Sequence, residues 1–179
     1  MSIIRHALLA ALLPAVALGV GMPATAFAAG GASTATITVT GGVLAISVPT
    51  DAGNLGSLAN TVGGGTISGP LGQVQVSDAR AAAAGSGWVA SVISTAFTPP
   101  SGPAIPASDV SYAAGVITKV GTATYTANDP SDLTGVVPAV TATGITGDNS
   151  ATWDPTITVT VDGGMAAGVY SATITHSVV

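Results

Sequence analysis

Cysteine is absent from this chain, and charged side chains make up only 6% of it. Without cysteine there is no disulfide framework, no thiolate metal site and no cysteine for lipid attachment. The cationic residues are three, Arg5, Arg80 and Lys119, and the net charge is -5. The basic surface that phosphate binding requires is therefore missing, and we expect no nucleic-acid partner.

Side chains with catalytic chemistry are equally scarce. The two histidines, His6 and His176, lie in no known nucleophile arrangement, and no G-x-S-x-G, phosphate-loop or H-E-x-x-H motif occurs. Asp148, Asn149 and Asp154 form the densest oxygen cluster, but their spacing matches no known calcium loop. We therefore expect no enzyme activity, no catalytic residue, no cofactor and no metal, and we interpret the oxygen cluster as a polar turn.

Residues 1–28 have the features of a secretory signal peptide. Arg5 and His6 give a basic start, residues 7–21 are apolar, and Ala26-Phe27-Ala28 has the small-x-small cleavage pattern. The apolar run of about 15 residues is shorter than the roughly 20 that a membrane-spanning helix needs. We expect cleavage after Ala28, and a secreted single domain, 29–179, with no membrane segment.

Threonine recurs at every second position of several segments and alternates with Ala, Ile or Val. Successive side chains of a strand point to opposite faces, so this pattern predicts half-buried strands with one aliphatic and one hydroxyl face. With the other alternating segments, the predicted strands are 34–40, 43–48, 73–77, 88–97, 110–112, 122–127, 136–143, 156–161 and 173–175.

Gly, Pro, Asn and Asp separate these segments, for example at 63–65 and 147–149, and the Pro-rich stretch 99–106 reads as a long loop. The helix-like stretch 79–84 is too short to carry a domain. The prediction is an all-β protein, a single immunoglobulin-like antiparallel β-sandwich of about nine short strands.

Three polar or aromatic residues are the candidates for a binding site. Asp78 and Arg80 are separated by one residue, which on a strand places both side chains on the same face, where they can form an ion pair. Trp88 follows shortly after them. An exposed tryptophan can stack on a sugar, whereas a buried one anchors the core. We predict Trp88, Asp78 and Arg80 as ligand-binding residues, with the core role of Trp88 as the alternative.

From Leu71 onward the order of segments resembles the WxL cell-wall-binding domain of Gram-positive surface proteins. The resemblance is carried by LGQVQVSDAR at 71–80, GWVASV at 87–92 with Phe97-Thr98, IPASDVSY at 105–112 and GVYSATITHSV at 168–178, and the strands within 34–48 resemble the opening strands of the family. The first Trp-x-Leu motif keeps Trp88 but has Ala90, and the second has His176 and Val178 in place of Trp and Leu. The resemblance implies a β-sandwich at the bacterial surface that attaches non-covalently to peptidoglycan.

The sequence thus leads to two functional hypotheses. The first is a secreted, non-enzymatic protein associated with the cell wall, with peptidoglycan or other surface proteins as partners. No L-P-x-T-G sorting motif is present, so we expect this association to be non-covalent. The alternative is a structural subunit of a surface layer or fibre that assembles through β-strand edges, since scarce charge leaves edges unprotected.

Overall fold

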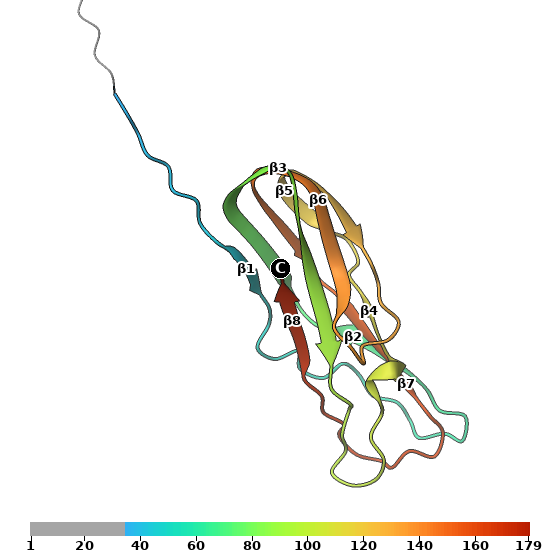
Figure 1. Ribbon diagram of the computed structural model, residues 1–179. Coiled ribbons are helices and arrows are strands. Elements are labelled where there is room, and N and C mark those ends of the chain that lie inside the picture. Colours follow the sequence, from blue (N-terminus) through green and yellow to red (C-terminus); the bar gives the residue numbers. More distant parts are fainter. Residues whose placement is uncertain (1–34) are drawn as a thin grey trace, which may run out of the picture. The chain divides into compact units, whose positions relative to one another are not determined.

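Strands form nearly all of the regular structure in the computed structural model, which describes residues 35–179 (Figure 1). The predicted signal segment, 1–28, lies outside the described residues. The elements are β1 (Leu44–Ser47), β2 (Gly65–Pro70), β3 (Val74–Ser94), the 3₁₀ helix η1 (Ala107–Asp109), β4 (Val110–Ala113), β5 (Thr118–Ala127), β6 (Val137–Trp153), β7 (Thr156–Val161) and β8 (Ile174–Val178).

Two antiparallel sheets make up the domain. In the larger sheet the strand order is β1-β3-β6-β5, and β8 also pairs with β3; in the smaller sheet the order is β2-β7-β4. The sheets pack face to face, which confirms the predicted all-β sandwich; the immunoglobulin-like strand order stays a prediction. No helix in the described part of the chain is long and apolar enough to cross a membrane.

Three stretches of chain pass from one sheet directly into the other. Only Leu71, Gly72 and Gln73 separate β2 from β3, and only Asp154 and Pro155 separate β6 from β7. The registers continue across these junctions, since Pro70 faces Thr156 and Val74 faces Trp153. β4 and β5 likewise follow one another against β7 and β6. Strands that switch sheets in this way hold the two layers in a fixed relation.

The larger sheet is bent where β3, β5 and β6 change register together. The β3–β6 register shifts between Asp78 and Trp88, and the β5–β6 register shifts near Gly121. Ala81 lies at the bend with a φ of 52°. Gly87 must be glycine, because a Cβ there would lie 2.6 Å from the carbonyl oxygen of Ala142. Figure 1 shows β3 arching over at this end of the sandwich.

The core lies between the sheets and is made of aliphatic side chains with a few large rings. Trp153, Tyr112, Leu133 and Ile145 are among its largest fully buried side chains. The inward residues come from alternate positions of each strand, as in β7, where Ile157 and Val159 are buried and their neighbours are not. The threonine faces therefore point outward, as the alternation predicted.

Several predicted boundaries are wrong in an informative way. The predicted strands 73–77 and 88–97 and the helix-like stretch 79–84 fall largely in one continuous strand, β3, which runs from Val74 to Ser94. The helix-like stretch is therefore strand at the bend of the sheet. The expected turn at 147–149 lies within β6. β2 was not predicted, because its sequence GTISGP contains Gly and Pro. A turn lies at 62–63, next to the predicted one at 63–65, whose last residue, Gly65, begins β2; the loop through 99–106 is present.

The predicted strand 34–40 is not a strand in its described part. Its described residues, 35–40, belong to none of the described strands and are exposed. Ile37 is 91% exposed and Val39 is 84% exposed.

Candidate functional site

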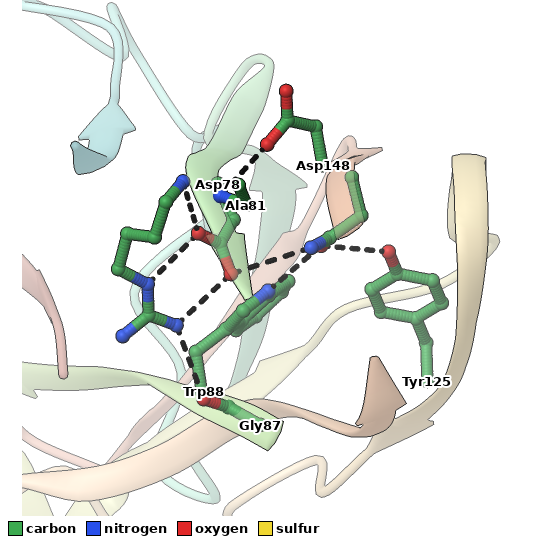
Figure 2. A network of polar contacts seen from close by, with 8 residues as sticks. Asp78, Ala81, Gly87, Trp88, Tyr125 and Asp148 are labelled. Carbon is green, nitrogen blue, oxygen red and sulfur yellow. Dashed lines mark hydrogen bonds and ion pairs between the residues drawn. The ribbon is translucent and has the colours of Figure 1, made fainter. Parts of the chain in front are cut away.

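The three residues predicted to bind ligand meet in one polar network at the bend of the larger sheet (Figure 2). Arg80 and Asp78 form a two-pronged ion pair, with Nε to Oδ1 at 2.8 Å and Nη2 to Oδ2 at 2.9 Å. Arg80 also donates to the carbonyl oxygen of Gly87 at 3.2 Å, which links the two halves of β3. A paired guanidinium and carboxylate in this geometry fix each other's orientation.

Asn149 of β6 is the centre of the network. Its Nδ2 donates to Asp78 Oδ2 at 3.3 Å, and its Oδ1 accepts hydrogen bonds from Trp88 Nε1 at 3.0 Å and from the Tyr125 hydroxyl at 3.2 Å. The Trp88 and Tyr125 rings lie against each other, with centroids 5.6 Å apart. One amide side chain thus joins β3, β5 and β6.

Burial explains why the network is fully bonded. Asp78 is 1% exposed, and a carboxylate at such a site is tolerated only if it is paired and hydrogen-bonded. The hydrogen bond from the Arg80 side chain is the main reason why the pKa of Asp78 lies below its ordinary value of 3.8. No buried side-chain nitrogen or oxygen in residues 35–179 lacks a hydrogen-bond partner.

The network therefore leaves few accessible polar atoms for a ligand. Trp88 is 2% exposed and packs in the core, which is the alternative role considered for it. The Arg80 side chain is the most accessible of the three, at 38% exposed. The ligand-binding role of Trp88, Asp78 and Arg80 stays a prediction, and the observed geometry is that of a structural clamp on the bend.

The two segments that carry the motif resemblance are neighbours in the larger sheet. Ala90 faces Val178 and Val92 faces His176 across the β3–β8 pair. Val89 and Val179 exchange two backbone hydrogen bonds, at 2.9 and 3.1 Å. Positions 88–92 and 176–179, which are far apart in the sequence, thus lie side by side as paired strands.

His176 connects this strand pair to the core. Its Nε2 lies 3.3 Å from the hydroxyl of Tyr112, which accepts a hydrogen bond from Trp153 Nε1 at 2.7 Å. Because an indole only donates, the proton of Tyr112 is free to go to a neutral His176 Nε2. Burial lowers the pKa of His176 to about 4, so the imidazole is neutral at pH 7.

A groove of about 820 Å³ opens between two long connections on the side of His176. One wall is the connection 48–64 and the other is 165–174; Asn60 Nδ2 donates to the carbonyl oxygen of Met165 at 2.9 Å and ties them together. The first connection lies against β2 because Gly69 has no Cβ, which would stand 2.3 Å from the Leu55 carbonyl oxygen.

The lining of the groove mixes apolar and neutral polar side chains and is uncharged apart from two carboxylates. It contains no Lys or Arg, and its acidic residues, Asp51 and Asp162, are exposed. Phe97 and Tyr170 supply rings, and the Tyr170 hydroxyl donates to Ala166 at 2.8 Å. The volume lies within the usual range of about 300–1,000 Å³ for small-molecule sites, and the walls combine rings with many neutral polar groups.

The groove was not predicted from the sequence, although one signal for it was present. The connection 48–64 holds no strand, and loops of that length in compact domains are commonly functional. The other wall, 165–174, overlaps the segment 168–178 that carries the motif resemblance.

The three residues of the predicted oxygen cluster lie in different surroundings. Asp148, from the predicted oxygen cluster, accepts the backbone N–H of Ala81 at 2.9 Å and supports the bend, while Asn149 is in the polar network and Asp154 is exposed at the end of β6. Within residues 35–179, no group of three or more His, Asp, Glu or Cys side chains is placed to hold a metal ion.

Fold and site together define a β-sandwich with a buried polar clamp and a largely uncharged groove. Comparison with protein-family models, with curated proteins and with solved structures finds no match to this chain.

Proposed function

We propose that the chain is a secreted, non-enzymatic surface protein that associates non-covalently with the cell wall, and that the groove beside His176 receives the glycan of peptidoglycan. The observation that carries the proposal is the groove itself, which is large enough for sugar rings and lined without cations. Sugars are neutral and rich in hydroxyl groups, so they need ring faces and neutral hydrogen-bonding partners rather than countercharges.

Two further features support a surface role. The apparent signal peptide at 1–28 directs the chain out of the cell, and the segments that resemble the wall-binding family lie side by side, with His176 of the second one lining the groove. The motif residue Trp88 contributes through the stability of the sheet, since it is buried.

The test is co-sedimentation of the chain 29–179 with isolated cell walls and with purified peptidoglycan, with an unrelated acidic protein as the control. We expect saturable binding to both, and loss of most of it in Tyr170→Ala, which removes a ring from the groove. Thr122→Ala, an exposed change on β5 outside the groove lining, is the matched control and should bind as the wild type does. A folded wild type that stays in the supernatant would contradict wall binding.

The alternative role, a subunit of a surface layer or fibre, is favoured by a separate observation. β5 lies at the edge of the larger sheet, and no described strand pairs with its outer side. This role is compatible with wall binding.

A further inference from the structure

We infer that the peptide stem of peptidoglycan binds in the groove as an added strand along the outer edge of β8. This inference rests on the proposed wall-binding function and names the part of the polymer that the edge recognises. It begins from the position of β8, which pairs with β3 on one side, while no described strand pairs with its other side. An open strand edge is a row of unpaired backbone donors and acceptors that another extended chain can complete.

The pairing of β8 with β3 decides which backbone groups of β8 point away from the sheet. Val89 and Val179 exchange two hydrogen bonds, and the register runs on through β8 without a shift. Because the N–H and C=O groups of successive residues in an antiparallel strand point to alternate sides, the odd-numbered residues of β8 face β3. The even-numbered residues, Ile174, His176 and Val178, therefore direct their N–H and C=O groups outward.

Two of these three residues line the groove. Ile174 and His176 belong to its lining, whereas Val178 does not. The open edge is therefore part of one wall of a cavity of about 820 Å³, and the connection 48–64 forms the other wall. β8 has five residues, so its edge suits a short extended peptide rather than a long strand.

The sequence of β8 does not guard this edge against pairing. The strand, ITHSV, contains no Lys, Arg, Asp, Glu or Pro, and its register with β3 has no bulge. Edges that natural proteins protect from pairing commonly carry one of these features. His176 adds no charge at pH 7, because burial lowers its pKa to about 4. An incoming backbone therefore meets an uncharged, regular edge.

The chemistry of the groove selects among the chains that could bind there. A sugar chain alone has no series of amide groups at strand spacing, so it cannot complete a strand edge. The charged residues of the lining, Asp51 and Asp162, are both acidic and would repel an acidic peptide. A short peptide that is neutral or carries an amino group matches this lining. Phe97 and Tyr170 line the same groove, so a stem peptide and the sugar that carries it can be held together.

The first test removes the peptide from the ligand. The chain 29–179 is titrated by calorimetry with soluble disaccharide–peptide fragments of peptidoglycan, and with the same disaccharides after an amidase has cleaved off the peptide. We expect the affinity to fall by about tenfold or more without the peptide, because its backbone hydrogen bonds are lost. Equal binding of both ligands would overturn the inference and leave the glycan-binding function standing. Binding of neither ligand would overturn both.

The second test removes single outward N–H groups from β8. Proline is tolerated on an edge strand where the missing N–H would point away from the neighbouring strand. Ile174→Pro removes such a group inside the groove lining, and Val178→Pro, the matched control, removes one outside it. Among variants that keep the wild-type circular dichroism spectrum, we expect Ile174→Pro to weaken fragment binding by about tenfold and Val178→Pro by less than about twofold. Equal effects of the two substitutions would overturn the assignment to this edge.

The third test uses the unaltered chain 29–179 and so does not depend on any variant folding. Amide hydrogen exchange is followed by NMR with and without saturating disaccharide–peptide fragment. The Ile174 and His176 amides should exchange about tenfold more slowly with the fragment, because they become donors to the added strand, while the Val178 amide and the peptide-free disaccharide should show no such change. Unchanged exchange at Ile174 and His176 would overturn the inference. Protection that grows with protein concentration and without ligand would also overturn it, since a second copy would then occupy the edge.

Discussion

The polar network at the bend depends on individual side chains, and Trp88 combines two roles in it. Its ring is buried against Tyr125 and the core, and its single polar atom donates to Asn149 Oδ1. Burying an indole is favourable only when its N–H finds an acceptor. Asn149 therefore makes the position suitable for tryptophan rather than for another large apolar residue.

The two roles of Trp88 can be separated by substitution. Trp88→Ala should lower the free energy of unfolding by about 3–5 kcal/mol, because it opens a large cavity. Trp88→Phe keeps most of the ring and loses the bond to Asn149, so the loss should be about 1–3 kcal/mol. Urea denaturation followed by circular dichroism measures both.

Tyr170→Phe is the control for this pair, because it removes one hydroxyl at a half-buried site on another surface, and we expect a change of less than about 1 kcal/mol. Equal losses for Trp88→Phe and Trp88→Ala would contradict the division into ring packing and hydrogen bond.

Part of this network was predictable from the sequence and part was not. The pairing of Asp78 with Arg80 follows from their i, i+2 spacing on a strand, which places both on one face. The hydrogen bonds of Asn149 to Asp78 and Trp88 join residues 71 and 61 positions apart, and the segment Gly147-Asp148-Asn149 has the composition of a turn. Local composition could not reveal that this turn-like segment crosses the sheet as part of a strand.

At the scale of elements, alternation predicted most strands and missed their continuity. β3 runs from Val74 to Ser94 through the alanine- and glycine-rich stretch 79–87, where the alternating pattern is lost. Pairing with β6 on both sides of the bend keeps this stretch in the sheet despite its composition. Pairing with β6 overrides the local propensity of this stretch, and a short sequence window cannot reveal pairing between distant segments.

β8 is held against β3 by backbone pairing, and the burial of His176 makes the stability of the fold depend on pH. The pKa of His176 is about 4 in the fold and 6.5 in an unfolded chain. Between these values the unfolded chain binds a proton that the folded chain does not, so stability is fully present above pH 6.5 and falls as the pH drops toward 4.

His176→Gln should remove this dependence while keeping a hydrogen-bonding side chain beside Tyr112. Denaturant midpoints at several pH values between about 4 and 7 should fall toward acid in the wild type and stay flatter in the variant. Asp162→Asn, an exposed carboxylate change, should follow the wild-type profile. Parallel profiles for wild type and His176→Gln would show that the imidazole is not neutralised by burial.

At the scale of the whole molecule, cationic side chains are scarce. Arg80 and Lys119 are the only Lys or Arg residues among 35–179, and Arg80 is already paired with Asp78. The contacts proposed for the groove therefore rest on burial and neutral hydrogen bonds rather than on cationic side chains. Such contacts are short-ranged and are not screened by ions.

Wall binding should accordingly be insensitive to salt. Raising the salt from about 0.05 M to about 0.5 M strongly weakens contacts between exposed charges, but it should change the fraction of chain 29–179 that co-sediments with peptidoglycan by less than about twofold. Lys119→Gln should bind as the wild type does, because Lys119 lies outside the groove. Release of the protein by salt, or by Lys119→Gln, would instead indicate binding to an anionic wall polymer through β5, and the groove would no longer be the wall site.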